Sequence, residues 1–208
     1  MAKLQVAIDL LTTEAALELA GKVAPYVDII ELGTPLIKAE GLKVVTAMKE
    51  AHPTKLVFAD MKTADTGALE AEMAFKAGAD LVTVMGAVDD ATIKGAVEAA
   101  AKYGRKVVVD TIGVKDRVLR AKEVTAFGVA FVELHAGLDE QALPGYSIQK
   151  LIDEGKAANV PFSIAGGVNI NTIKAVLEAG AEVIVAGGAI YGAEDPAAAA
   201  KALKEAIS

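Results

Sequence analysis

The sequence contains no cysteine and no tryptophan, and only two of its 208 residues are histidines. The lack of cysteine excludes disulfides, thiolate metal sites and a cysteine nucleophile. His52 and His135 are too few for a multi-histidine zinc site. Aromatic residues make up 4% of the chain, so the core must be built from alanine, valine, isoleucine and leucine.

Basic residues are outnumbered, at 21 against 28 acidic residues, which gives a formal net charge of −7. This balance argues against nucleic acid or an anionic membrane as a partner. An anionic substrate would therefore need a locally positive pocket. No apolar run reaches the length of a membrane span, and the start of the chain lacks a secretory signal pattern. We therefore expect a soluble cytoplasmic protein.

Short runs rich in β-branched residues alternate with helix-like segments along the whole chain. In the helix-like segments, apolar residues recur at three- and four-residue spacing, as on a helix face that packs against a sheet. The predicted strands span residues 4–9, 27–32, 55–60, 80–85, 106–111, 130–135, 160–165 and 182–187. Eight strand–helix units in 208 residues are close to the minimum for a (β/α)8 barrel.

The alternative architecture is a doubly wound open sheet. However, the loop after the first predicted strand contains no glycine and so lacks the GxGxxG fingerprint of that fold. No linker rich in proline, glycine or serine divides the chain. We therefore predict an α/β protein in which residues 1–208 form one single-domain (β/α)8 TIM barrel.

In such a barrel, catalytic groups project from the carboxyl ends of the strands. The predicted strands end on ionisable or hydroxyl side chains, and the last two end on glycine pairs. In chain order these are Asp9, Glu31, Asp60 with Lys62, Thr83, Asp110, His135, Gly166–Gly167 and Gly187–Gly188. One acidic residue in a strand–helix loop is often only a helix cap, but the whole set indicates an active site.

The stretch "VFADMKTAD" places Asp60, Lys62 and Asp65 at the end of the third predicted strand. Strand alternation predicts that Asp60 and Lys62 face the same side. An ammonium held between carboxylates can stabilise an enediolate oxyanion, because its charge is fixed before the reaction begins. The simpler interpretation makes Asp65 a helix cap and Lys62 a surface residue.

Two further patterns predict bound groups. Glu31 and Asp60 end neighbouring strands, and two carboxylates that face one cavity suit Mg²⁺, with Mn²⁺ able to replace it. The pairs Gly166–Gly167 and Gly187–Gly188 follow the last two strands, where barrels commonly bind phosphate through backbone N–H groups.

The two histidines receive different interpretations. His52 precedes a proline in a helix–strand loop and is interpreted as a surface residue. His135 closes the sixth strand among the other polar strand ends, which favours general acid–base chemistry over a core histidine.

These residues resemble the signature of the orotidine-phosphate decarboxylase suprafamily of barrels. The D-x-K-x-x-D motif of Asp60, Lys62 and Asp65 carries the resemblance, and matching segments such as "VAIDL", "ELHAGLDEQ" and "VAGGAIYG" extend it over essentially the whole chain. The metal-dependent branch contains 3-keto-L-gulonate-6-phosphate decarboxylases and 3-hexulose-6-phosphate synthases. Four positions separate these activities, and all four are synthase-like here: Asp110, Leu138, Ala165 and Gly188.

The resemblance implies a reversible aldol addition of formaldehyde to D-ribulose 5-phosphate. Mg²⁺ would be held by Glu31 and Asp60, Lys62 would stabilise the enediolate, and His135 would move the proton. Asp9 and Asp110 would order the sugar hydroxyls and tune Lys62, and the glycine pairs would hold the phosphate. Asp65 would reach into the partner's site of a homodimer.

Three alternatives stay open from the sequence. The first is decarboxylation of a sugar-acid phosphate through the same enediolate. The second is a Schiff-base aldolase with Lys62 as nucleophile. The third is a non-catalytic sugar-phosphate sensor on an inherited barrel.

Overall fold

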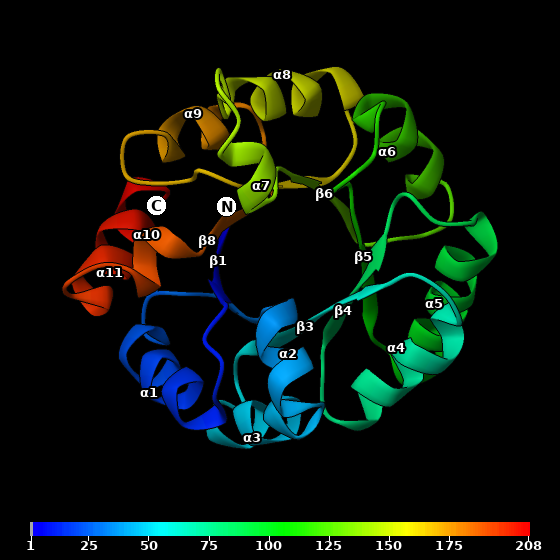
Figure 1. Ribbon diagram of the computed structural model, residues 1–208, viewed down its shortest axis with the longest axis horizontal. Helices are drawn as coiled ribbons and strands as arrows, with labels where there is room; N and C mark the ends of the chain where they lie inside the picture. The colour runs from blue at the N-terminus through cyan, green and yellow to red at the C-terminus, as the bar shows by residue number, and fades with distance from the viewer. Residues whose placement is uncertain (1) are drawn as a thin grey trace.

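Eight parallel strands close into a barrel in the computed structural model, which describes residues 2–208. Each strand pairs with its neighbours in chain order, and β8 pairs with β1 to complete the ring. Figure 1 looks down this ring and shows the helices arranged around it. The prediction of a (β/α)8 barrel is confirmed, and the open doubly wound sheet is excluded.

All eight predicted strands are present, with ends that differ by a few residues at most. Their bounds are β1 Lys3–Ile8, β2 Ile29–Leu32, β3 Leu56–Thr63, β4 Leu81–Met85, β5 Lys106–Asp110, β6 Phe131–His135, β7 Phe162–Ala165 and β8 Val183–Ala186. The largest difference is in β3, which continues to Thr63 instead of ending at Asp60.

Eleven helices lie within residues 2–208. Their bounds are α1 Thr13–Val23, α2 Thr34–Glu40, α3 Lys43–Ala51, α4 Gly67–Lys76, α5 Asp90–Tyr103, α6 Arg117–Thr125, α7 Leu138–Gln141, α8 Gln149–Ala158, α9 Ile173–Glu178, α10 Gly188–Tyr191 and α11 Pro196–Ala206. The additional helices α2, α7 and α10 follow the carboxyl ends of β2, β6 and β8. In Figure 1 they lie nearer to the barrel axis than the outer helices.

Local signals explain several helix ends. The Thr12 side chain accepts a hydrogen bond from the backbone N–H of Ala15 and so caps α1. Asp195 caps α11, and Pro196 occupies its first turn. Helices α4 and α5 approach so closely that a Cβ atom on Gly67 would lie 1.9 Å from the carbonyl oxygen of Thr92. Only glycine fits at that crossing.

The barrel interior changes from apolar to polar along the strands. Inward-facing apolar residues fill most of its length: Ile29, Phe58, Leu81, Val108, Phe131, Ala165, Val183 and Val185. Two residues beyond Ile29, Phe58, Val108 and Phe131, the same strand faces carry Glu31, Asp60, Asp110 and Glu133. The apolar layers therefore support a ring of acidic side chains at the carboxyl end. Within the described residues, no helix is long and apolar enough to cross a membrane.

Candidate active site

Lys62 lies between two carboxylates at the carboxyl end of the barrel. Its Nζ is 2.7 Å from Oδ2 of Asp60 and 2.9 Å from Oδ2 of Asp110. Burial alone would lower the pKa of Lys62, but the charges of Asp60 and Asp110 outweigh it and raise the pKa well above its usual value. Lys62 is therefore a fixed cation, and its interpretation as a surface residue is wrong.

Regular strand alternation does not by itself explain the position of the Lys62 side chain. The pairing of β3 with β4 shifts register between Ala59 and Thr63, and Lys62 has a positive φ of 43°. Its backbone N–H donates to Oγ1 of Thr83 at 2.9 Å, which holds the irregular strand in place. The prediction that Asp60 and Lys62 share a side is correct, but a bulged strand produces it. Such unusual backbone geometry is often found at functional sites.

Asp110 connects Lys62 to His135. Oδ2 of Asp110 lies 2.9 Å from Nδ1 of His135, and Oδ1 accepts the backbone N–H of Ile112 at 2.8 Å. Burial would raise the pKa of Asp110, but the hydrogen bond with His135, together with the charge of Lys62, holds it below its usual value. The carboxylate thus fixes Nδ1 of His135 as the donor and leaves Nε2 as the proton acceptor.

The backbone of His135 is held on both sides. Its N–H donates to Oγ1 of Thr111 at 3.2 Å, and its carbonyl accepts from Nη2 of Arg117 at 3.1 Å. The Thr111 hydroxyl in turn donates to the carbonyl of Glu133 at 2.9 Å. Side chains from the segment after β5 therefore fix the end of β6.

Glu31 and Asp60 lie on adjacent strands with their carboxylates buried at 4% and 5% exposure. Burial and the charge of Asp60 raise the pKa of Glu31 to about 8. Gln5 donates to Oε2 of Glu31 at 2.7 Å, while Thr34 and Thr83 donate to the two carboxylate oxygens of Asp60 at 2.8 and 2.7 Å. The structure thus brings together the two predicted metal ligands, with oxygen donors around them.

Asp9 lies just beyond β1 and beside this group. Burial and the charge of Asp60 raise the pKa of Asp9, so the two carboxylates are electrostatically coupled. A Cβ atom on Gly33 would lie 2.0 Å from Oδ1 of Asp9, so only glycine lets the two strand ends approach this closely.

Glu133 belongs to the same acidic cluster and was missed by sequence reasoning. It is 2% exposed, and its Oε1 lies 3.8 Å from Nδ1 of His135. Burial, and then the charges of Glu31 and Asp110, raise the pKa of Glu133 well above its usual value. The signal was available, because Glu133 lies two residues before His135 in an otherwise apolar strand and must face the same interior.

The glycine pair after β7 requires glycine. Gly166 and Gly167 have φ values of 113° and 79°, and a Cβ on Gly166 would lie 2.5 Å from the carbonyl oxygen of Ala136. The Tyr146 hydroxyl donates to the Gly166 carbonyl at 2.8 Å and holds this turn. Tyr146 is a second residue that the sequence did not single out.

The pair after β8 is arranged differently. Gly187 precedes α10 and Gly188 begins it, and neither has a φ in the left-handed region. The first N–H groups of a helix have no partner within that helix, so they are free to contact a ligand. All four predicted glycines therefore lie at the carboxyl end of the barrel.

Asp65 and His52 lie apart from this cluster. Asp65 is exposed, and its Oδ1 accepts only the adjacent N–H of Thr66, at 2.7 Å. Thr66 precedes α4, and no side chain among residues 2–208 caps that helix, so the helix-cap interpretation of Asp65 is wrong. His52 ends α3 in a helix–strand loop, as predicted, but it is partly buried and not a fully exposed surface residue.

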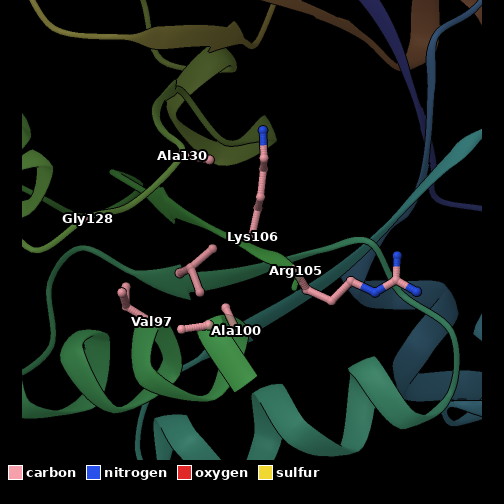
Figure 2. A pocket seen from close by; sticks show the side chains of 8 residues that line it. Val97, Ala100, Arg105, Lys106, Gly128 and Ala130 are labelled. Atoms are coloured by element: carbon pink, nitrogen blue, oxygen red, sulfur yellow. The ribbon is translucent and has the colours of Figure 1, made fainter. Parts of the chain in front are cut away.

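Two cavities lie at the other end of the barrel. One, of about 700 Å³, is lined at the strand starts by residues that include Lys3, Ile29 and Val183. A smaller one of about 220 Å³ lies between α5 and the start of β5, where Figure 2 shows Arg105 and Lys106 pointing in different directions. Neither contains any predicted site residue, so the polar cluster at the carboxyl ends remains the candidate active site.

A parallel (β/α)8 barrel with an ammonium, a histidine and acidic side chains at its carboxyl end defines the class of protein as a barrel enzyme. The model of the orotidine 5'-phosphate decarboxylase / HUMPS family matches residues 2–203. The chain belongs to this family.

Individual proteins and solved structures are also similar to this chain. The chain is 69% identical to 3-hexulose-6-phosphate synthase of Mycobacterium gastri over 206 residues, which cover 99% of this chain and all of that protein. A crystal structure of 3-hexulose-6-phosphate synthase has a TM-score of 0.98 and 70% identity over 99% of this chain and 100% of that one. A crystal structure of KGPDC from Streptococcus mutans has a TM-score of 0.93 but 27% identity, over 99% of this chain and 97% of that one.

Proposed function

We propose that this chain catalyses the 3-hexulose-6-phosphate synthase reaction, the reversible aldol addition of formaldehyde to D-ribulose 5-phosphate. The observation that carries the proposal is the 69% identity to a synthase along essentially the whole chain. The product would be D-arabino-hex-3-ulose 6-phosphate. In this reaction a base removes a proton from C1 of the ketose, the resulting 1,2-enediolate attacks formaldehyde, and a proton returns to the new alkoxide.

Lys62 supplies fixed positive charge at the enediolate. Its ammonium is held by Asp60 and Asp110 before any substrate arrives, so no reorganisation is needed when negative charge develops. The same carboxylates keep Lys62 protonated. A Schiff-base nucleophile must be deprotonated, so this environment disfavours the Schiff-base alternative.

His135 moves the proton. Its Nδ1 is bonded to Asp110, so Nε2 is the atom that can accept a proton from C1 and later return it to the alkoxide. Asp110 acts as the orienting group for this imidazole, in the manner of the acid in a catalytic triad. Asp9 is assigned the ordering of the sugar hydroxyls.

The donor set fits a divalent cation. Glu31 is a buried carboxylate, and burial together with the charge of Asp60 raises its pKa to about 8 although Gln5 and Lys62 act in the opposite direction. Hard oxygen donors from Glu31 and Asp60 suit Mg²⁺, or Mn²⁺ in its place. When bound, the ion would polarise the ketose oxygens and lower the cost of forming the enediolate.

The phosphate group is assigned to the two glycine pairs, Gly166–Gly167 and Gly187–Gly188. Backbone N–H groups can bind a dianion without cationic side chains, which suits a chain with a net charge of −7. The homodimer in which Asp65 completes the partner's site is proposed from the family resemblance, and the exposed carboxylate of Asp65 is accessible for such a contact. A cytoplasmic location stays a prediction of the sequence.

A paired assay tests the proposal. Purified protein with Mg²⁺ should consume formaldehyde only when ribulose 5-phosphate is present, and it should release little CO₂ from 3-keto-L-gulonate 6-phosphate. EDTA should abolish the activity and added Mg²⁺ should restore it, whereas a Schiff-base enzyme would keep it and yield a borohydride-trapped adduct. Binding of ribulose 5-phosphate without exchange of its C1 proton in D₂O would instead support the sensor alternative.

A further inference from the structure

Arg117 is a buried cation next to the candidate active site that the proposed mechanism does not use. It is the first residue of α6, and it is 5% exposed. Its Nη2 donates to the His135 carbonyl at 3.1 Å and to Oε2 of Glu140 at 2.5 Å. Its Nη1 lies 3.5 Å from Oε2 of Glu154. The guanidinium therefore lies where the end of β6 meets α6, α7 and α8.

These contacts connect a reactive residue to its surroundings. The His135 carbonyl is at the last position of β6, where the strand ladder ends and the backbone needs another partner. Glu140 lies in the four-residue helix α7, which is too short to be stable alone. Arg117 is thus a side chain that joins the backbone of His135 to the segment that follows it, beside the contact of Gln141 with the Ala136 carbonyl.

We infer that Arg117 is a positioning residue for His135, and this inference rests on the proposed function. With the His135 N–H held by Thr111 and the carbonyl held by Arg117, the backbone is fixed and the imidazole is directed towards Asp110. The planar guanidinium can contact the carbonyl and a carboxylate at the same time, which a lysine cannot do with the same geometry. Arg117 acts through His135 and touches no reacting atom.

Arg120 provides a matched control on the same helix. It is also a largely buried arginine, with its side chain 16% exposed, and it also ties down a loop. Its Nε donates to the Gly86 carbonyl at 2.8 Å and its Nη2 to the Val88 carbonyl at 3.1 Å. It contacts no predicted site residue, so Arg120→Gln measures the general cost of removing such an arginine.

The test compares Arg117→Gln, Arg117→Lys and Arg120→Gln in the Mg²⁺-loaded enzyme. A misplaced catalytic group can cost about 100-fold in rate, so we expect Arg117→Gln to lower kcat by about 10- to 100-fold with KM for ribulose 5-phosphate within about threefold. Arg117→Lys should recover part of that loss, and Arg120→Gln should stay within about twofold of the parent kcat, as expected of a residue whose side chain contacts no predicted site residue. Equal kcat losses in both glutamine variants would overturn the inference, as would a change confined to KM.

A second measurement, NMR of the histidine side chains, does not depend on catalytic activity. The chain has two histidines, so imidazole NMR signals of the substrate-free protein can be assigned with a His52→Gln variant. Arg117→Gln should shift the His135 signals and leave those of His52 in place, while Arg120→Gln should shift neither. Unchanged His135 signals in folded Arg117→Gln would overturn the inference. If the parent protein itself lacks formaldehyde-consuming activity, the proposed function fails, and this spectrum still decides whether Arg117 positions His135.

Discussion

Lys62 Nζ lies 2.9 Å from Oδ2 of Asp110, the same oxygen that lies 2.9 Å from Nδ1 of His135. One carboxylate therefore holds both the cation proposed to stabilise the enediolate and the imidazole proposed to move the proton. A change at any of these residues should alter the other two.

Replacing Lys62 with alanine should remove most activity and leave the protein folded. Loss of a preorganised charge at a developing oxyanion costs at least about 10²- to 10³-fold in kcat, and we expect a greater loss here because no other cation contacts both carboxylates. Stability should fall by about 2 kcal/mol, less than the roughly 3–5 kcal/mol typical of breaking a fully buried pair, because the Lys62 side chain is 22% exposed. Steady-state kinetics and urea unfolding measure the two effects.

Lys49→Ala is the matched control for that variant. Lys49 pairs with Asp80 at 2.7 Å with its side chain 26% exposed, close to the 22% of Lys62, but at the opposite end of the barrel. It should lose a similar amount of stability and keep its kcat. If both lysine variants lose activity equally, or if Lys62→Ala fails to fold, Lys62 has a structural role instead.

Asp110→Asn should disorder the proton-moving group. The amide no longer fixes Nδ1 of His135 as the donor, and it removes a counter-charge of Lys62, so kcat should fall by about 10²- to 10⁴-fold, the range of general acid–base catalysis. Nitrogen NMR of the imidazole should show a mixture of tautomers in place of one. Asp80→Asn offers the comparison, since Asp80 also binds two cations, Lys49 and Arg105, but lies far from His135. A loss below tenfold in Asp110→Asn would contradict the proposed orienting role.

Much of this arrangement could be predicted from the sequence because it depends on short-range patterns. Asp60, Asp110 and His135 could be predicted to lie together because each ends a predicted strand, and the (β/α)8 topology brings the carboxyl ends of the strands together. The bulge that turns Lys62 towards Asp110 could not be predicted, because it depends on contact with Thr83 of the next strand. Asp65 could not be placed either, since the environment proposed for it is in a second subunit.

Residues that support the site from behind have a weaker sequence signal than residues that line it. Arg117 lies at the start of a helix, where an arginine is ordinarily solvated. Its burial arises only because α7 and α8 fold over it from a later part of the chain. Tyr146 is similar, since its contact with the Gly166 carbonyl joins residues that are 20 apart in sequence.

The metal-free protein should lose stability as the pH rises, and Glu31 should cause part of that loss. The pKa of Glu31 is raised from 4.5 to about 8 by folding. Its contribution to stability is therefore fully present below pH 4.5, and it is lost progressively as the pH rises to about 8, because the folded state retains a proton that the unfolded state has released. The slope should approach at most about 1.4 kcal/mol per pH unit for one proton.

Urea unfolding from pH 5 to pH 8 in EDTA, for the parent and for Glu31→Gln, measures this contribution. The glutamine variant cannot titrate at this position, so its stability should fall less steeply with pH than that of the parent. Saturating Mg²⁺ should stabilise the parent more at pH 8 than at pH 5, because binding requires the ionised carboxylate. Parallel pH dependences in the two proteins would show that Glu31 ionises normally.

Gly167→Ala and Gly188→Ala should differ, although both positions are assigned to phosphate binding. Gly167 has a φ of 79°, so alanine there is strained and should cost about 1–2 kcal/mol of stability. At Gly188 the added methyl would meet only Tyr191, at an ordinary 3.9 Å, and no positive φ is required. Gly167→Ala should move the backbone N–H groups and raise KM for ribulose 5-phosphate by about tenfold, equivalent to about 1.4 kcal/mol of binding. Gly188→Ala should leave KM within about threefold.

Competition by inorganic phosphate tests whether the glycine turn contacts the phosphate group. In Gly167→Ala this competition should weaken in proportion to the rise in KM. If KM rises but inhibition by phosphate is unchanged, the turn contacts the sugar and not its phosphate group.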